Sequence, residues 1–177
     1  MKIPLDKVRY VTNPTPTVLV STLSKEGRKN IAPFGMFMNC SCNPPMVLFG
    51  ARKKIHTYKY LKETGEFVVG IPPSKIVKQV YKASEINEGD EFEGSGLTPI
   101  ASKSVKPFSI KECEANLECK FVREIETGDH VMIIGEVIDG IMDDKLFSKD
   151  NANIRTNLDS LYHVTNDVFT SKGKVIK

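Results

Sequence analysis

Three consecutive cations occupy positions 52 to 54 and stand directly before His56 and Thr57. A helix is predicted to follow, since Thr57 is a good N-cap residue and Gly65 suits the left-handed position that often ends a helix. The N–H groups at a helix N-terminus carry partial positive charge and favour an anion such as phosphate. One interpretation is therefore a phosphate held by Arg52, Lys53, His56 and Thr57. The alternative is a solvated basic turn in which His56 faces water.

Small and amide side chains mixed with apolar ones lie upstream of the cations, at Asn30, Ala32, Asn39 and Ser41. Pro44-Pro45 interrupts this run, and a short apolar strand follows at Met46–Gly50. Two strands, a basic turn and a helix start within a short stretch form a cradle suited to an anion.

The cysteines allow two interpretations. Cys40 and Cys42 form C-x-C, whereas five residues separate Cys113 from Cys119. Structural zinc sites usually use tighter pairs such as C-x-x-C. Alternation along a strand places positions 40 and 42 on one face, so a metal site stays open. The other interpretation is free thiols that pack as small apolar residues in a reducing compartment.

Among the remaining polar residues, His130 follows Gly128-Asp129 and begins a strand. It is interpreted either as a functional histidine or as a turn histidine bonded to Asp129. His163 has no motif around it and is assigned a structural role. The chain contains no G-x-S-x-G elbow, P-loop or G-x-G-x-x-G turn. The acidic stretch from Glu88 to Glu93 lacks the ligand spacing of a calcium loop.

The predicted elements are mostly strands. Strands are expected at Val18–Leu23, Asn30–Asn39, Met46–Gly50, Phe67–Ile71, Leu117–Val122 and Val131–Ile138. Helices are expected at Tyr58–Thr64 and, capped by Ser74, at Lys75–Ala83, with loops at Asn39–Pro45 and Asn87–Pro99. The predicted strands outnumber the two inserted helices, and the connections between elements are short. This pattern predicts an antiparallel barrel and argues against a Rossmann domain.

Composition narrows the class of protein. A chain of 177 residues is one domain by the usual size prior, and its 40% hydrophobic and 27% charged content is typical of a soluble globular protein. A net charge of +3 does not indicate a nucleic-acid binder. No apolar run approaches the ~20 residues that span a membrane. The N-terminal residues lack the apolar core of a signal peptide, so a cytoplasmic location is expected.

A set of short motifs carries a family resemblance. In order these are N-x-A-P at 30–33, S-x-N-P-P at 41–45, R-K-x-x-H-T at 52–57, T-G-E-F at 64–67, G-L-T-P at 96–99 and G-D-H at 128–130. The set is similar to the flavin reductase-like family of FMN-binding split barrels, over about residues 8–147. The resemblance implies a mainly β, antiparallel split barrel of Greek-key type with inserted short helices. It implies one domain over residues 1–177, in which the tail 148–177 matches less clearly.

The resemblance also implies a function. The leading hypothesis is an FMN-binding oxidoreductase. NADH or NADPH would deliver hydride to its flavin, and a free flavin, a metal ion or a partner protein would accept the electrons. The others are a flavoredoxin-like electron-transfer protein and a non-catalytic split-barrel binding module that has lost flavin. The cysteines are not expected to be needed for turnover. His130 is assigned a catalytic place near the flavin ring. The implied cofactor-binding residues are Asn30, Ala32, Pro33, Asn39, Cys40, Ser41, Ala51, Arg52, Lys53, His56 and Thr57.

A homodimer with FMN near the subunit interface is the expected assembly. A small barrel offers shallow surface for so large a ligand, and closed two-fold dimers are the commonest soluble oligomers. The candidate contributors from the second chain are Glu88–Thr98 and Tyr162–Phe169, neither of which has an evident core role in the sequence. The alternative is that the tail packs on its own barrel.

Overall fold

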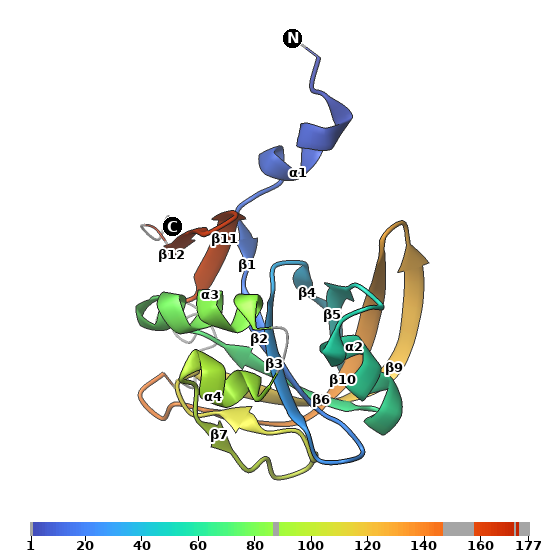
Figure 1. Ribbon diagram of the computed structural model, residues 1–177, viewed down its shortest axis with the longest axis vertical. Helices are drawn as coiled ribbons and strands as arrows, with labels where there is room; N and C mark the ends of the chain where they lie inside the picture. The colour runs from blue at the N-terminus through green and yellow to red at the C-terminus, as the bar shows by residue number, and fades with distance from the viewer. Residues whose placement is uncertain (1, 87–88, 147–157, 172, 174–177) are drawn as a thin grey trace.

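A computed structural model describes residues 2–86, 89–146, 158–171 and 173, and its centre is an antiparallel sheet (Figure 1). The sheet has seven strands in the order β3-β2-β6-β9-β10-β5-β4, and every neighbouring pair is antiparallel. The strands are β2 Val18–Leu23, β3 Lys29–Phe34, β4 Phe37–Cys42, β5 Pro45–Ala51, β6 Glu66–Ile71, β9 Ala115–Thr127 and β10 His130–Met142. This architecture confirms the predicted mainly β, antiparallel fold with inserted helices.

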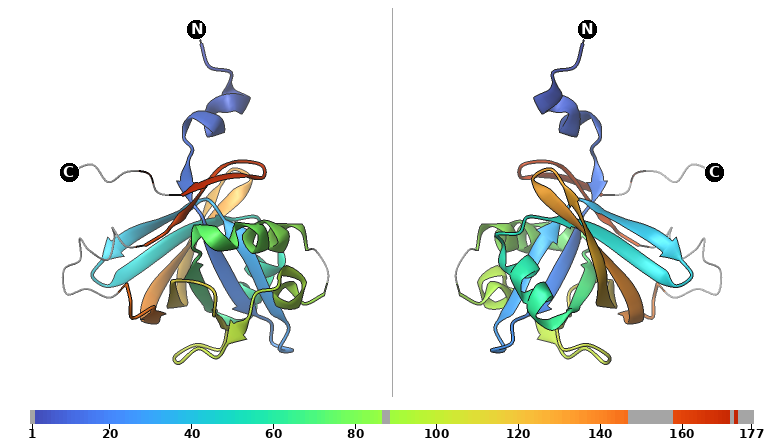
Figure 2. Two further views of the ribbon diagram at one scale, coloured as in Figure 1. Left: turned by 90° about the vertical axis from the view of Figure 1, so that its left-hand side faces the viewer. Right: turned by 90° about the vertical axis from the view of Figure 1, so that its right-hand side faces the viewer.

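Smaller elements surround this sheet. A three-stranded sheet joins β1 Thr15–Pro16, β11 Leu161–Thr165 and β12 Val168–Ser171, and a two-stranded one joins β7 Pro99–Ile100 and β8 Ser109–Ile110. The helices are η1 Leu5–Lys7, α1 Val8–Val11, α2 His56–Thr64, η2 Ser74–Ile76, α3 Val77–Glu85 and α4 Glu91–Ser95. Helix α2 packs on β2 and β3, and α3 and α4 pack on β3. The N-terminal segment with α1 stands clear of the body in all ribbon views (Figures 1 and 2).

Strand β2 is buried on both of its faces, because the sheet separates two apolar clusters. Val18 and Val20 belong to one cluster with the interior residues of β5, β6 and β10, while Leu19 between them belongs to a second cluster with residues of α3 and α4. Successive side chains of a strand point to opposite faces. Burial on both faces explains why three successive residues at the start of this strand are apolar and do not alternate with polar ones.

Three phenylalanines connect strands across the first cluster. The ring of Phe49 lies edge-on to Phe34 at 5.0 Å between centroids and to Phe67 at 5.4 Å. A Cβ on Gly135 would lie 2.2 Å from the Phe67 ring, so only glycine fits there on β10. These contacts hold β3, β5, β6 and β10 around a single interior.

The prediction of one unbroken strand over Asn30–Asn39 is wrong. The chain leaves β3 after Phe34, turns at Gly35-Met36, and resumes as β4, which pairs with β5 at the other end of the strand order. The loop predicted at Asn39–Pro45 is also wrong, since β4 runs to Cys42 and Pro45 begins β5. Proline is tolerated as the first residue of a strand, which is the position that Pro45 takes.

The predicted loop at Asn87–Pro99 contains the short helix α4, as far as its residues are described. Asp90 caps this helix, because its carboxylate accepts hydrogen bonds from the N–H groups of Phe92 and Glu93 at 3.0 and 3.3 Å. Five residues are too short for the hydrophobic periodicity that signals a helix. The strands predicted at Leu117–Val122 and Val131–Ile138 are confirmed as parts of β9 and β10, and both strands extend further at each end than predicted.

The segments expected to lack a core role do have one. Phe92 and Leu97, from the acidic stretch, are 1% and 3% exposed, and Leu161 of β11 is 2% exposed. All three belong to the second apolar cluster, and Phe169 packs against it. In the described part of the tail, 158–171 and 173, the chain therefore packs on its own body. The rest of the predicted tail, and Glu88 of the acidic stretch, lie outside the described residues.

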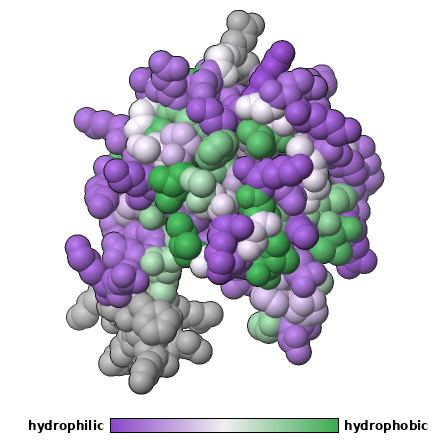
Figure 3. Space-filling model, turned by 90° about the horizontal axis from the view of Figure 1, so that it is seen from below, coloured by the Kyte–Doolittle hydropathy of each residue, from purple (hydrophilic) through white to green (hydrophobic). Residues whose placement is uncertain are grey.

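The surface mixes hydrophilic residues with several apolar ones, as the view from below shows (Figure 3). Large apolar side chains exposed on the long β9–β10 hairpin are Val122, Ile125, Ile138 and Ile141. No helix among the described residues has the length and apolar character needed to cross a bilayer.

Candidate functional site

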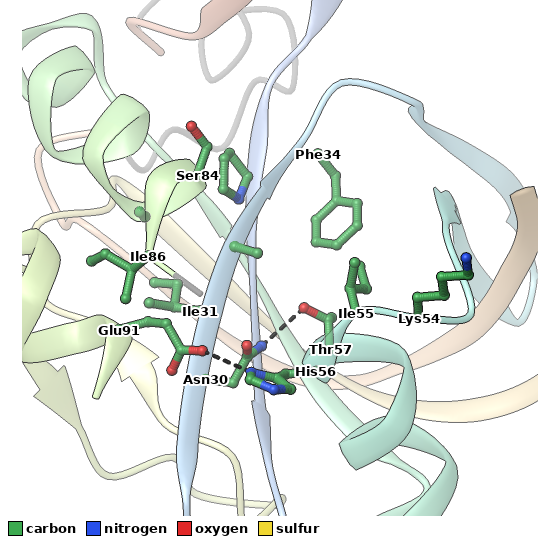
Figure 4. A pocket seen from close by; sticks show the side chains of 13 residues that line it. Asn30, Ile31, Phe34, Lys54, Ile55, His56, Thr57, Ser84, Ile86 and Glu91 are labelled. Carbon is green, nitrogen blue, oxygen red and sulfur yellow. Dashed lines mark hydrogen bonds and ion pairs between the residues drawn. The ribbon is translucent and has the colours of Figure 1, made fainter. Parts of the chain in front are cut away.

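A cavity of about 500 Å³, here named the α2 cavity, lies where β3 meets the start of α2 (Figure 4). One wall is β3 from Asn30 to Phe34, and the opposite wall is the segment from Lys54 to Thr57. The ends of α3 and α4 complete it with Ala83, Ser84, Ile86 and Glu91. Segments distant in sequence therefore meet around one space.

A second cavity of about 440 Å³, the His130 cavity, adjoins the first. The two share Pro33, Phe34 and Ile55, which form an apolar boundary between them. The rest of the lining comes from the N-terminal segment, the β3–β4 connection, the end of β5 and two histidines: Thr12, Asn13, Thr15, Gly35, Met36, Gly50, Ala51, Arg52, His130 and His163. The two adjoining cavities are together called the groove.

A third cavity, the hairpin cavity, has a volume of about 640 Å³. Its lining comes from the β2–β3 turn, the first turns of α2 and the start of the α4 segment: Gly27, Arg28, Lys29, His56, Tyr60, Gly89 and Asp90. It shares His56 with the α2 cavity. His56 is therefore part of the wall of both cavities.

A buried amide fixes the floor of the α2 cavity. The Asn30 side chain donates hydrogen bonds to the hydroxyls of Thr22 at 3.0 Å and Thr57 at 2.9 Å, which ties β2, β3 and α2 together. Thr57 was predicted to cap the helix, but α2 begins at His56 after Ile55, and no side chain caps it. The first N–H groups of a helix have no acceptor within the helix. Without a side-chain cap, those of α2 remain available to a ligand.

A carboxylate and an imidazole meet at the edge of the α2 cavity. Glu91 is 3% exposed, and its Oε1 lies 3.3 Å from Nδ1 of His56 (Figure 4). The His56 ring also stacks on Tyr60, with centroids 5.5 Å apart and planes 2° from parallel. The start of α4 is anchored because Asp90 forms a 2.9 Å ion pair with Lys29. Helix α4 thus fixes the orientation of His56 through Glu91.

His130 makes the predicted contact with its turn and also lines a cavity. Its Nδ1 lies 2.7 Å from Oδ1 of Asp129, the turn contact, and the ring also lines the His130 cavity. The hydrogen bond with His130 lowers the pKa of the Asp129 carboxyl. Nη2 of Arg52 lies 3.6 Å from the other oxygen of Asp129, so the cation and the histidine share one carboxylate.

The structure brings together eight of the twelve predicted site residues. Asn30, Ala32, Pro33, His56 and Thr57 line the α2 cavity, and Pro33, Ala51, Arg52 and His130 line the His130 cavity. The predicted phosphate residues are divided, because Arg52 faces the His130 cavity while His56 and Thr57 face the α2 cavity.

Four predicted residues lie outside the three cavities. Asn39, Cys40 and Ser41 lie on β4, the last strand in the sheet order. The Lys53 ammonium bonds to Glu126 of β9, and this hydrogen bond raises the pKa of Lys53. Of the other three cysteines, Cys119 is buried, which raises the pKa of its thiol to about 12.

Sequence reasoning missed several lining residues. Lys54 lines the α2 cavity and makes no ion pair with the residues the structure describes, although it belongs to the same cationic run as Lys53. Glu91 was missed because its segment was read as a loop. His163 lines the His130 cavity, and its ring lies tilted against that of Phe169 with centroids 5.4 Å apart. No sequence motif would have identified it.

Replacement of Asn30 by alanine is expected to lower the free energy of unfolding by about 1–3 kcal/mol, since two buried hydrogen bonds are lost. The matched control is Asn39→Ala, an amide removed from an exposed position on β4, with an expected change within about 0.5 kcal/mol. Urea unfolding of both variants measures the difference. Equal stability of the two would show that the Asn30 amide does not join β2, β3 and α2.

Comparison with known proteins gives a consistent result. The model of the family described as "Flavin reductase like domain" matches residues 10–165. An uncharacterized protein of Aquifex aeolicus is 34% identical over 145 residues, covering 75% of this chain and 74% of that protein. A flavin reductase of Pseudomonas putida is 27% identical over 124 residues, covering 70% of this chain and 71% of that protein. An uncharacterized protein of Archaeoglobus fulgidus is 47% identical over 85 residues, covering 47% of this chain and 48% of that protein.

Solved structures confirm the split-barrel fold. Flavoredoxin of Desulfovibrio vulgaris superposes with a TM-score of 0.85 and 26% identity, covering 100% of this chain and 96% of its own. Nitrilotriacetate monooxygenase component B from Bacillus cereus superposes with a TM-score of 0.89 and 23% identity, covering 99% and 95%. A putative flavin reductase with a split barrel domain from Shewanella frigidimarina gives a TM-score of 0.84 and 21% identity, covering 99% and 92%.

Proposed function

The chain belongs to the flavin reductase-like family, and on that premise we propose that it binds FMN in the groove made by the α2 and His130 cavities and acts as an oxidoreductase through it. The observation that carries the proposal is the division of this groove. The α2 end offers the Lys54 cation and the uncapped helix N–H groups. The other end offers apolar side chains such as Met36 beside Arg52 and two histidines, and Phe34 and Ile55 lie between the two ends. FMN has the same division between its phosphate and its ring.

The residues present fit the phosphate of FMN at the α2 cavity. Lys54 supplies a cation with no ion pair among the described residues, Thr57 supplies a hydroxyl, and the uncapped start of α2 supplies N–H donors. Charged groups form the stronger hydrogen bonds to phosphate, and helix N-termini favour anions. His56 stands beside them with its Nδ1 turned to Glu91, which leaves the opposite ring nitrogen for a ligand.

The residues present also fit the flavin ring at the His130 cavity. Phe34, Ile55 and Met36 form the apolar lining, which covers a ring and keeps water from it. When bound, FMN supplies the redox chemistry, accepting hydride and passing electrons on. The protein's part is to hold the cofactor, to exclude water and to place His130 at the edge of the cavity. NADH or NADPH is the proposed donor, and a free flavin, a metal ion or a partner protein the acceptor.

The first experiment is an absorbance spectrum of the purified protein after addition of FMN and removal of excess flavin. Retained flavin bands support the proposal, and a colourless protein that binds no FMN in a titration would overturn it in favour of the non-catalytic module. Anaerobic addition of NADH or NADPH then follows bleaching of the bound flavin. Bleaching identifies a reductase, whereas FMN that stays oxidised identifies a flavoredoxin-like protein that takes electrons from a partner.

Replacement of His130 by alanine is expected to slow reduction of bound flavin by the nicotinamide about 10- to 100-fold, because His130 lines the proposed ring end of the groove. FMN affinity should change much less, since the phosphate ligands are untouched. Stopped-flow reduction and an FMN titration measure the two effects. The control is Asp129→Asn, which alters the turn carboxylate bonded to His130 but keeps the ring. A reduction rate in His130→Ala equal to wild type would leave His130 as a turn histidine only.

We also propose a homodimer whose contact includes the N-terminal segment. Leu5 is 90% exposed and Val11 is 62% exposed, on a segment that stands clear of the body (Figure 2). Thr12 and Asn13, which follow directly, line the His130 cavity, so this segment reaches the proposed site.

The dimer is tested by light scattering at micromolar concentration. The expected mass is twice the 19.8 kDa of one chain. Leu5→Ser combined with Val11→Ser should shift the mass toward one chain, because apolar contact area is lost, while the control Lys2→Ser should leave it unchanged. A wild-type mass of one chain would contradict the proposal.

A further inference from the structure

Glu91 is a buried carboxylate at the edge of a cavity that is proposed to hold an anion. It is 3% exposed, and it lines the α2 cavity together with Lys54 and the start of α2. A carboxylate in this place repels a phosphate, and burial of its charge is costly unless a partner compensates it. The side-chain partner that the described residues offer is His56, whose Nδ1 lies 3.3 Å from Oε1 of Glu91 (Figure 4). A role for Glu91 therefore has to act through His56.

The backbone on both sides of Glu91 is anchored. The preceding residue, Asp90, caps α4 with its carboxylate and forms a 2.9 Å ion pair with Lys29. The following residue, Phe92, is 1% exposed and belongs to the second apolar cluster. Glu91 lies between these two anchors, so its carboxylate approaches His56 from a fixed base.

The ring of His56 is restrained by a second contact. It stacks on Tyr60, one turn further along α2, with planes 2° from parallel. Glu91 and Tyr60 together restrict the rotation of the ring. The second ring nitrogen, Nε2, has no hydrogen-bond partner among the described residues, and the side chain that carries it lines the α2 cavity.

The contact with Glu91 decides what His56 can offer to a phosphate. An ionised carboxylate is only an acceptor, so Nδ1 of His56 carries the proton that lies toward Glu91. If the imidazole is neutral, Nε2 presents a lone pair, which repels phosphate oxygens. If it is an imidazolium, Nε2 carries a second proton and can donate it. A neighbouring negative charge favours this charged form.

Other charged groups surround His56 as well. The charged or titratable residues that share its two cavities, besides Glu91, are Arg28, Lys29, Lys54, Tyr60 and Asp90. Lys29 and Asp90 neutralise each other in their ion pair. Glu91 is the charged residue in contact with the His56 ring.

From this geometry we propose that Glu91 is a positioning residue for the phosphate of FMN and acts through His56. It orients the ring and favours the imidazolium, so that Nε2 donates a charge-assisted hydrogen bond to the phosphate beside Lys54. The proposal rests on the proposed function, which places the phosphate in the α2 cavity. It predicts the opposite sign from simple repulsion. Removal of the Glu91 charge would strengthen phosphate binding if repulsion alone acted, whereas it weakens binding if His56 depends on Glu91.

The test compares Glu91→Gln with wild type by calorimetric titration of the flavin-free full-length protein with FMN and with riboflavin. Glutamine keeps the size of the side chain and can still accept a hydrogen bond from Nδ1 of His56, but it has no charge. Glu91→Gln is expected to weaken FMN about 10- to 100-fold, the effect of one charge-assisted hydrogen bond. Riboflavin affinity should not change, because riboflavin has no phosphate. The matched control is Glu93→Gln, an exposed carboxylate of the same helix, which should keep wild-type FMN affinity.

Two further measurements separate positioning from a structural role. In the His56→Ala background, Glu91→Gln should no longer weaken FMN and should strengthen it slightly, because only repulsion is then removed. Nitrogen NMR of the imidazole, assigned through the loss of its signals in His56→Ala, should show two protonated ring nitrogens in the wild-type FMN complex. The Glu91→Gln complex should show one. A structural Glu91 would weaken FMN in either background and leave the protonation of the ring unaltered.

Three results would overturn the inference while leaving FMN binding by the chain intact. These are tighter FMN binding by Glu91→Gln than by wild type, an equal loss of FMN and riboflavin affinity, and an equal loss of FMN affinity with and without His56. Absence of any FMN binding by wild type would instead defeat the proposed function, and the inference with it.

Discussion

The double variant Lys54→Ala/His56→Ala is expected to weaken FMN binding by about 2–4 kcal/mol, roughly 30- to 1000-fold, through loss of charge-assisted hydrogen bonds to the phosphate. Both side chains line the α2 cavity at the uncapped start of α2, where helix N–H groups already favour an anion. Titration with FMN and with riboflavin measures the effect. Riboflavin has no phosphate, so its affinity should be nearly the same in the variant and in wild type.

The matched control is Lys53→Ala, which removes a neighbouring cation of the same run. Its ammonium bonds to Glu126 and lines none of the three cavities described here, so FMN affinity should not change. If Lys53→Ala weakens FMN as much as the double variant does, the phosphate lies where the sequence motif alone predicted it. If riboflavin is weakened together with FMN, the double variant has altered the whole groove, and Lys54 and His56 are not phosphate ligands.

The second large effect concerns the scaffold. Phe49→Ala is expected to lower the free energy of unfolding by about 3–5 kcal/mol, because it removes a fully buried ring and leaves a cavity. The ring contacts Phe34 and Phe67 edge-on and thereby connects β5 to β3 and β6. Strand β5 leads directly into the cationic turn, so the cluster that Phe49 stabilises also supports the site.

Urea unfolding followed by circular dichroism measures this loss. Phe49→Leu keeps most of the apolar volume and is expected to cost less than about 1.5 kcal/mol. Val122→Ala truncates a side chain that is 44% exposed on the β9–β10 hairpin, and its expected effect is within about 0.5 kcal/mol. A loss in Phe49→Ala no greater than that of Val122→Ala would mean that the interior relaxes around the missing ring and that the three phenylalanines do not govern stability.

Much of the fold and the family was available from the sequence, because the signals involved are local. Strand β2 was predicted at its observed bounds, since a segment rich in β-forming and apolar residues lies between Thr17 and a Gly27-containing turn. The end of α2 was predicted from Gly65, which has the left-handed φ of 72° that glycine adopts without strain. The ordered motifs from residue 30 to residue 130 led to the flavin reductase-like family, whose model matches residues 10–165.

The composition of the site was decided by the tertiary structure. In the turn between β5 and α2 the three successive cations diverge: Arg52 points to Asp129, Lys53 to Glu126 and Lys54 to the α2 cavity. No periodicity predicts these directions, because a turn has neither the two-residue repeat of a strand nor the 3.6-residue repeat of a helix. The carboxylates that attract the first two cations lie on the distant β9–β10 hairpin, which only folding brings close.

The same reason explains Glu91 and the break after Phe34. A carboxylate within a short acidic segment is solvated by default, and Glu91 is buried because α4 packs on β3 and meets His56. The polar stretch from Asn30 to Ser41 looks continuous, yet β3 and β4 lie at opposite ends of the strand order because β4 pairs with β5. Local residue types determined where most strands of the large sheet lie, whereas long-range pairing determined which of their polar residues share a cavity.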